Sequence, residues 1–176
     1  MEIKIEERII YREAEISDAL QLSVLLGHVF IDTYGTEGVN SESANFIFKE
    51  FSVKNTEKLI MDNSENIIIA TYKDNIVGVA EMEFNKICPV DNIIAPELNK
   101  LYVLERFCGK GIGYNLLKKV EEIIITKEVN EIWLSVLSTN ERAVSFYERQ
   151  GFKWIGNFDF QMEFSSHDNK VMHKKL

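Results

Sequence analysis

Cysteine and proline are scarce in this chain of 176 residues, which contains two of each. Cys88 and Cys108 are too few for a disulfide framework and lack the spacing of a metal knuckle, so we read both as reduced thiols. Pro89 and Pro96 fall in one loop, and no Pro-, Gly- or Ser-rich linker divides the sequence. We therefore predict a single domain over residues 1–176.

Long apolar runs are also absent. Uninterrupted apolar runs such as residues 123–125 are far too short to cross a bilayer, and no N-terminal segment joins a basic start to an apolar stretch. We therefore expect no membrane partner and a cytoplasmic location.

Basic residues are outnumbered, with 20 Lys and Arg against 28 Asp and Glu and a formal net charge of −8. Because nucleic-acid binding depends on neutralising phosphates, no nucleic-acid partner is expected. An acidic surface attracts cations, which is a hint of an amine-bearing substrate, although ordinary solubility explains the same charge. The three histidines have no ligand-like spacing, so no metal is predicted.

Hydrophobic periodicity predicts alternating strands and helices. The first strand is expected at residues 8–14, and Ser17 is a good N-cap for the helix that follows. The further elements expected are helices at 42–51 and 56–62, strands at 67–72, 76–84 and 98–103, a helix from 113, a strand at 131–137, a helix at 141–150, and strands at 152–160 and 169–175. This order predicts an α/β (α+β) fold in which helices flank a mixed central sheet of about six to seven strands.

Three glycines lie within residues 108–113, between an extended segment and a helical one. Glycine lets successive amides converge on an anion just where a helix presents unpaired donors, so the turn suits a phosphate. It is not a Walker A loop, because Gly111 follows Lys110 where Ser or Thr is required. It is not a dinucleotide fingerprint either, because Tyr114 and Leu116 occupy the sixth positions. A plain flexible turn remains the alternative.

A second group of residues follows at positions 140–152. Asn140 can cap a helix in which Ala143 and Tyr147 fall near the same edge, so an amide and a phenol point toward the end of the preceding strand. Taken alone, Tyr147 would be read as packing beside Phe146.

The pattern N-x-x-A-x-x-F-Y-x-x-x-G-F, downstream of a strand, an x-x-G-x-G turn and a helix, resembles the GCN5-related N-acetyltransferase (GNAT) family. This family transfers acetyl from acetyl-CoA to an amine, and the resemblance runs from about residue 67 to the C-terminus. Within the family, the chain is most similar to PaiA-type bacterial polyamine (spermidine/spermine) acetyltransferases, which share Ile132-Trp133-Leu134 and a Phe-x-Asp-Thr-Tyr segment at 30–34. The resemblance implies the GNAT fold, with acetyl-CoA as the donor cosubstrate.

The resemblance also implies roles for individual residues. The CoA pyrophosphate would lie on the turn of Cys108, Gly109, Lys110, Gly111, Ile112 and Gly113, and the pantetheine arm would pair with Leu101, Tyr102 and Val103. Asn140 would touch the same arm, Tyr147 would lie beside the thioester sulfur, and Thr33 and Tyr34 would line the acceptor pocket, although helix-end packing explains those two equally well. Two positions depart from the family: Cys108 replaces Gln or Arg, and Asn99 replaces a Glu that is a candidate base.

The chemistry requires a base, because an alkylamine is almost wholly protonated at pH 7. Glu97 shares a strand face with Asn99 and is the predicted base, with Glu81 and Glu83 as substitutes; each could equally be a solvated surface carboxylate. Tyr147 would donate its proton to the departing thiolate, and direct attack needs no protein nucleophile.

The predicted function is acetyl transfer to the primary amine of a small molecule, with a polyamine as the candidate. Two alternatives stay open: a peptide or protein N-acetyltransferase, and a CoA-binding regulatory module with weakened catalysis. Because relatives often dimerise, a homodimer also stays open.

Overall fold

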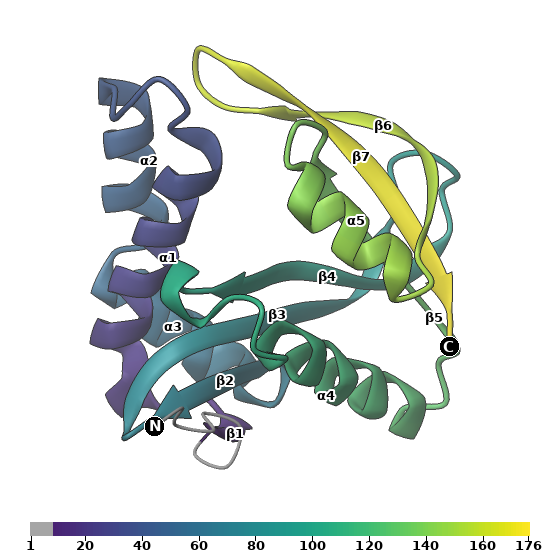
Figure 1. Cartoon of the computed structure of the whole chain (residues 1–176), viewed down its shortest axis with the longest axis horizontal. Helices are drawn as coiled ribbons and strands as arrows, with labels where there is room; N and C mark the ends of the chain where they lie inside the picture. Colours follow the sequence, from purple (N-terminus) through teal and green to yellow (C-terminus); the bar gives the residue numbers. More distant parts are fainter. Residues whose placement is uncertain (1–8) are drawn as a thin grey trace. The chain divides into compact units, whose positions relative to one another are not determined.

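The computed structural model describes residues 9–176, so residue 8 of the predicted first strand lies outside the described residues. The helices are α1 Ala19–Tyr34, α2 Ser41–Glu50, α3 Val53–Asn63, α4 Ile112–Thr126 and α5 Glu141–Arg149, with short 3₁₀ turns at η2 Ile16–Asp18, η3 Ser64–Asn66 and η4 Glu105–Phe107. The strands are β1 Ile9–Glu13, β2 Ile67–Tyr72, β3 Asn75–Ile87, β4 Ile94–Val103, β5 Glu131–Leu137, β6 Lys153–Gln161 and β7 Ser166–Lys175 (Figure 1).

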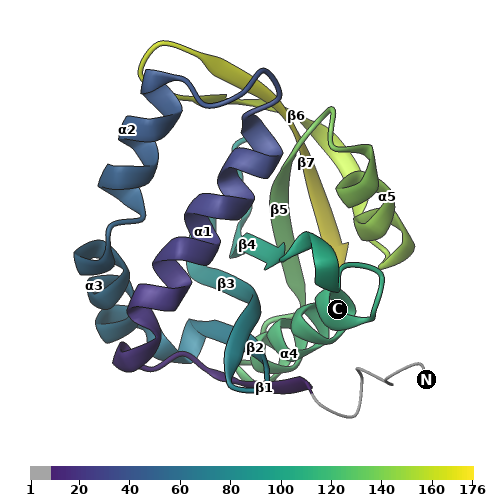
Figure 2. The ribbon, with the colours of Figure 1, turned by 60° about the vertical axis from the view of Figure 1, so that its left-hand side comes forward.

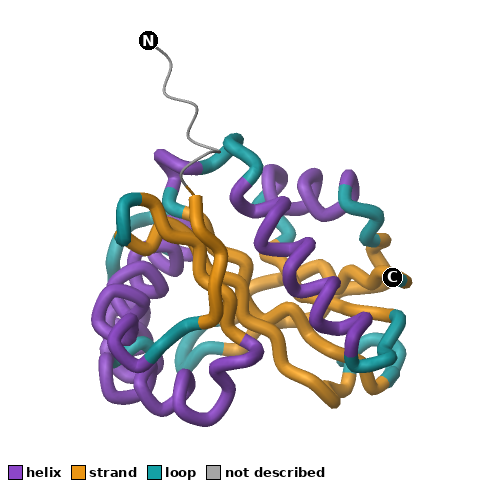
Figure 3. The backbone as a smooth tube through the Cα atoms, turned by 90° about the horizontal axis from the view of Figure 1, so that it is seen from below, coloured by secondary structure: helices purple, strands orange, loops and turns teal. Residues whose placement is uncertain are grey.

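The strands form a seven-stranded sheet in the order β1-β2-β3-β4-β5-β7-β6. β4 pairs with β5 in parallel, whereas the β1/β2, β2/β3, β5/β7 and β6/β7 pairs are antiparallel. Figure 3 shows the strands in orange and the helices in purple. The prediction of a mixed sheet of about seven strands with flanking helices is confirmed.

Contacts divide the chain into two compact units, which are described one at a time. The first unit contains the chain up to Glu81 together with Lys100–Val120, and the second contains Met82–Asn99 and Glu121–Leu176. In the first unit, α1 contacts both α2 and α3 (Figure 2). In the second unit, α5 lies beside β6 and β7 (Figure 1 and Figure 2).

The core of the first unit explains why α4 begins where it does. Ile112, Leu116, Leu117 and Val120 are each at most 1% exposed, so the apolar stripe predicted for this helix is buried from its first residue. Burial of the stripe fixes the start of the helix, and with it the position of the glycine turn.

The core of the second unit is built around Trp133 of β5 and Val171 of β7. Cys88 and Ala95, from the loop and strand that follow β3, pack against them. Burial raises the pKa of the Cys88 thiol, and both cysteines are free. Cys88 therefore packs in this core as a free thiol, and neither cysteine forms a cross-link.

The sequence favours an antiparallel hairpin with its turn at Lys73-Asp74-Asn75, and the structure has a two-residue turn there, because Asn75 pairs with Tyr72. The turn lacks the usual Asn-Gly or Asp-Gly pair. Lys73 and Asp74 take the left-handed φ values of 50° and 63° that such a turn requires. The Nδ2 of Asn75 donates to the carbonyl of Lys73 at 2.8 Å, which supports this uncommon backbone.

Two predicted boundaries are wrong for physical reasons. β3 extends to Ile87 and β4 begins at Ile94, so Pro96 lies inside a strand and the predicted loop at 85–96 is much shorter. A proline lacks only a backbone donor and is tolerated where the ladder does not need one.

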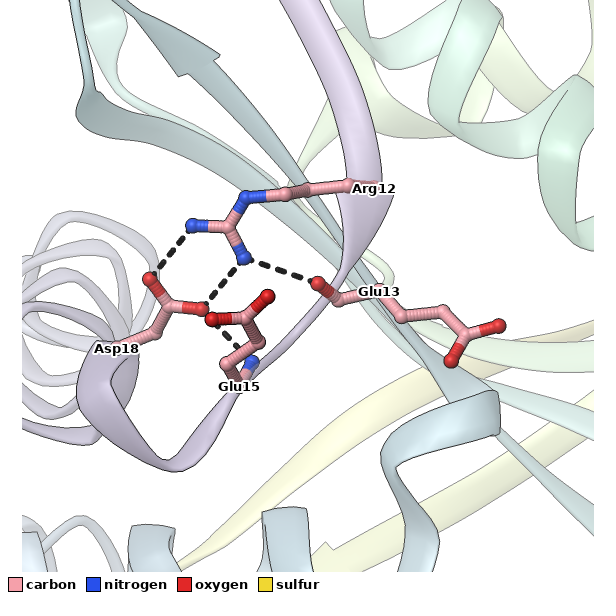
Figure 4. A network of polar contacts seen from close by, with 4 residues as sticks. All are labelled: Arg12, Glu13, Glu15 and Asp18. Atoms are coloured by element: carbon pink, nitrogen blue, oxygen red, sulfur yellow. Dashed lines mark hydrogen bonds and ion pairs between the residues drawn. The ribbon is translucent and has the colours of Figure 1, made fainter.

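Ser17 is not the cap of the first helix. Glu15 precedes η2, its backbone amide donates to the Asp18 carboxylate at 2.7 Å, and Asp18 is also held by two bonds from Arg12 at 2.7 and 2.8 Å (Figure 4). A long-range bidentate pair from β1 thus replaces the local cap that the sequence favours.

We predict that Asp18→Asn lowers the free energy of unfolding by about 1–2 kcal/mol at pH 7, because an amide cannot accept both guanidinium bonds. The hydrogen bond from Arg12 lowers the pKa of Asp18, so its contribution is fully present above the unfolded pKa. It is lost as pH falls through the folded pKa, and the difference from wild type should shrink below about pH 4. Urea denaturation at several pH values measures this. Asp62→Asn, at an exposed position of α3, is the control, and an equal loss in both variants would contradict the prediction.

Candidate active site

The glycine turn lies in the first unit, between η4 and α4. Gly109 and Gly111 have φ values of 72° and 80°, a region that side chains rarely adopt. The amide of Asn115 donates to the carbonyl of Gly111 at 3.0 Å, which starts the helical hydrogen bonding. The amides at the start of α4 therefore have no carbonyl one turn earlier in the helix, which is the arrangement that binds anions.

Cys108 belongs to the frame of this turn. Its amide donates to the Glu105 carbonyl at 3.1 Å, and its thiol donates to the Val103 carbonyl at 3.6 Å. The amide and thiol hydrogens of Cys108 are thus both bonded to carbonyls of residues that precede the turn. Anion binding would therefore depend on the amides after Cys108 and on the helix start.

The side chain of Lys110, within the same turn, contacts residues just before the turn. Its Nζ donates to the Arg106 carbonyl at 2.7 Å and sits 5.3 Å from the centre of the Phe107 ring. Both contacts are with exposed or half-buried groups, so this ammonium can exchange them for a phosphate at small cost.

The end of β4 leads into the turn, and it is held to β3 where the amide of Leu104 donates to the Val77 carbonyl at 2.9 Å. Gly78, beside Val77, carries no motif, but a Cβ there would lie 3.0 Å from the Tyr102 carbonyl and 3.2 Å from Leu116 Cδ1. Only glycine fits without displacement of the strand expected to pair with pantetheine. The signal in the sequence is an isolated glycine inside a β-rich run.

The two predicted acceptor residues of α1 are occupied within the helical part of the first unit. The Thr33 hydroxyl donates to the Val29 carbonyl at 2.8 Å, one turn earlier in the same helix. The Tyr34 ring lies 4.9 Å from that of Phe30, which stacks on Phe46 at 4.6 Å. These contacts are the helix-end packing that the sequence offers as the alternative for both residues.

Glu81, on β3, is buried at 7% exposure and accepts a hydrogen bond from Lys100 Nζ at 2.8 Å. This carboxylate is therefore already in contact with a cation of the same unit.

In the second unit, Glu97 lies on β4 in register with Trp133 of β5, and its side chain is half-buried. Two positions on, Asn99 Nδ2 donates to Glu83 Oε2 at 3.2 Å, and Lys86 Nζ lies 3.3 Å from the same oxygen. Glu83 is thus an exposed carboxylate with two polar neighbours, while the residue found in place of the family Glu acts as a donor to it.

Asn140 caps α5 as predicted. Its Oδ1 accepts from the Ala143 amide at 3.1 Å, and its own amide donates to the Leu137 carbonyl at 2.9 Å. With the oxygen used by the cap, the NH₂ group is the other polar group of this side chain. That group is suited to donate to a carbonyl such as those of pantetheine.

Tyr147 lies about two helical turns beyond Asn140 and is buried at 8% exposure. Its ring packs edge-on against Phe146 and Phe152, with centres 5.3 and 5.6 Å away. Burial raises the pKa of the phenol well above its ordinary value. Tyr147 therefore stays protonated at any working pH and can act only as a donor of its proton.

Residues 9–176 contain no group of three or more His, Cys, Asp or Glu side chains arranged to hold a metal ion. Over the same residues, no helix combines the length and apolarity needed to cross a membrane.

Comparison with known proteins agrees with this geometry. The acetyltransferase (GNAT) domain family matches residues 30–167. An uncharacterized N-acetyltransferase of Chlorobaculum tepidum is 28% identical over 144 residues, which cover 82% of this chain and 75% of that protein. The spermine/spermidine N(1)-acetyltransferase of Bacillus subtilis is 34% identical over 80 residues, or 45% of this chain and 49% of that protein.

The solved structure of the PaiA N-acetyltransferase from Thermoplasma acidophilum, in complex with coenzyme A, superposes with a TM-score of 0.75 at 25% identity. The superposition covers 96% of this chain and 99% of the Thermoplasma acidophilum chain. The family match spans most of the sequence, and the matched region contains both the glycine turn and the Asn140–Tyr147 helix. The chain therefore belongs to the GNAT family and is an acetyl-CoA-dependent N-acetyltransferase.

Proposed function

We propose that this enzyme acetylates a primary amine of a small molecule, with polyamines such as spermidine and spermine as the first candidates. The observation that carries the proposal is the 34% identity to the Bacillus subtilis spermine/spermidine N(1)-acetyltransferase over 80 residues, together with the likeness to a PaiA structure. The net charge of −8 favours a cationic acceptor in the same sense.

On this proposal, the turn at residues 108–113 binds the CoA pyrophosphate through backbone amides, and residues 101–103 pair with the pantetheine arm. The NH₂ group of Asn140 donates to a carbonyl of that arm. Binding that depends on the backbone tolerates Cys108 where relatives carry a longer polar side chain. The fit is supported by the two left-handed glycines and by the cap that fixes Asn140.

The acceptor must lose a proton before it attacks the thioester. A neutral amine at pH 7 costs roughly 4 kcal/mol for a pKa near 10. We assign the proton transfer to Glu97, directly or through a water, and the binding of the ammonium to Glu81, where an acceptor would compete with Lys100 for the carboxylate. Tyr147 then donates its proton to the departing thiolate.

Acceptor identity is tested by thiol release from acetyl-CoA with spermidine, spermine, single amino acids and short peptides. We expect kcat/KM for a polyamine to exceed that for any peptide by at least about tenfold, because a peptide N-terminus carries one charge where a polyamine carries several. A peptide preference would transfer the proposal to the protein N-acetyltransferases. Tight CoA binding with no acceptor-dependent release would favour a regulatory module.

Tyr147→Phe should lower kcat by about 10²-fold, because the general acid is lost. The dissociation constant for CoA, measured by calorimetry, should change by less than about twofold, since the ring remains in place. Because burial raises the pKa of Tyr147, wild-type turnover should show no loss from phenol ionisation up to about pH 10. Tyr114→Phe removes an exposed phenol from α4 and is the control. Unchanged turnover in the Tyr147 variant would remove this residue from the mechanism.

Glu97→Gln should lower kcat/KM by about 10²-fold at pH 7, because no positioned base then remains to take the proton of the acceptor ammonium. The loss should shrink as the pH approaches 10, where the acceptor is neutral in solution. Glu83→Gln is the matched control, since it removes an exposed carboxylate from the neighbouring strand. A larger loss for Glu83→Gln than for Glu97→Gln would assign the base to Glu83 instead.

A further inference from the structure

Two aromatic rings and two lysines form a continuous group beside the glycine turn. Lys73 Nζ lies 5.3 Å from the centre of the Tyr72 ring, and the Tyr72 and Phe107 ring centres are 5.7 Å apart. Lys110 Nζ lies 5.3 Å from the centre of the Phe107 ring. We call these four residues the lysine–aromatic stack. All four belong to the first unit, as does the turn itself.

The stack brings together residues that are far apart in the sequence. Tyr72 and Lys73 come from the tip of the β2–β3 hairpin, whereas Phe107 and Lys110 flank Cys108 on either side. Both rings are half-buried and both neighbouring backbones are constrained, Lys73 by its left-handed conformation and Phe107 by η4. The rings are therefore held in place, while the ammonium groups at the ends of flexible stems can move.

The charge of the stack is opposite to that of the whole chain. Lys73 and Lys110 place two cations on the same pair of rings in a protein whose net charge is −8. The neighbouring carboxylates in the sequence are Asp74, whose charge helps to raise the pKa of Arg12, and the exposed Glu105, which is followed by the exposed Arg106. A local cationic group in an acidic protein is the signature of a bound anion rather than of general solubility.

When the pyrophosphate of CoA lies on the turn, pantetheine extends from one side of it and adenosine from the other. Pantetheine follows β4, so the adenosine and its 3′-phosphate have to lie on the surface beside the turn. That half of the ligand pairs a flat purine with a phosphate dianion, and the stack pairs flat rings with ammonium groups. A contact between a lysine and an exposed ring is weaker than one with a phosphate dianion, so the lysines can leave the rings when the nucleotide binds.

We propose that the lysine–aromatic stack is the subsite for the 3′-phosphoadenosine of the donor. Tyr72 and Phe107 receive the purine, and Lys73 and Lys110 receive the 3′-phosphate. The enzyme thereby distinguishes acetyl-CoA from a donor that lacks this phosphate. The inference rests on the donor site of the proposed function and adds the residues that read the nucleotide end.

The test compares binding of CoA and 3′-dephospho-CoA to the full chain by calorimetry. Two lysine contacts to one dianion at a partly exposed site should make CoA bind about tenfold more tightly than 3′-dephospho-CoA. Lys73→Gln should reduce this ratio to about threefold, and the double variant with Lys110→Gln should bring it close to one. Raising the salt concentration should reduce the wild-type ratio in the same way, because exposed charges are screened.

Phe107→Leu provides an independent readout. Because both ligands carry adenine, this variant should weaken both by a similar factor and leave their ratio unchanged. Lys58→Gln, at an exposed position of α3, removes the same charge outside the stack and should leave the ratio at its wild-type value. The lysine variants lie on the surface, so they test the inference even if Phe107→Leu unfolds.

Each remaining outcome overturns a defined part of the argument. A wild-type ratio near one, or a ratio that survives in the double lysine variant, would overturn the subsite while acetyl transfer from acetyl-CoA stays intact. Failure to bind either ligand would overturn the subsite and the assigned donor site together.

Discussion

The proposed donor site depends on a strand-to-helix turn whose backbone only glycine adopts without strain. Gly109 and Gly111 hold left-handed conformations between a strand bonded to β3 and a helix whose first residue, Ile112, is 1% exposed. Both ends of the turn are therefore fixed by the core, which also fixes the orientation of the backbone amides between them. Because backbone geometry and packing set the conformation of the turn, its first position does not need a particular side chain. Cys108 at that position bonds to the carbonyls of Val103 and Glu105, which precede the turn.

The same reasoning separates the ionisable groups of the site by their surroundings. Tyr147 is enclosed by two aromatic rings, which keeps its proton in place until a strong base forms beside it. Glu81 is buried against Lys100, whereas Glu97 is half-buried on β4. A site that must hold one proton and remove another needs groups whose environments differ in this way. In the proposed mechanism, the buried Tyr147 is the acid and the half-buried Glu97 is the base.

The elements predicted correctly from the sequence are those determined by short-range patterns. The apolar stripe of α4, the Asn140 cap and the Lys73-Asp74 hairpin each need only neighbours within a few residues. The errors have the opposite origin. Ser17 has the right chemistry for a cap, but Arg12 reaches Asp18 from another element and changes which residue closes the helix. Pro96 reads as a loop residue in the sequence, but it lies inside β4.

The same distinction explains why the donor can be read from the sequence more easily than the acceptor. A pyrophosphate is bound by a contiguous run of amides, and a contiguous run leaves a motif. The partners of Glu81 and of Asn99 lie 19 and 16 positions away along the chain, and their pairing follows from the alignment of β3 with β4 rather than from any local pattern. Tyr72 and Phe107 are still further apart in the sequence, so their ring contact also leaves no motif. Groups assembled across strands specify what the enzyme discriminates, and the pairing of the strands has to be known before such groups can be recognised.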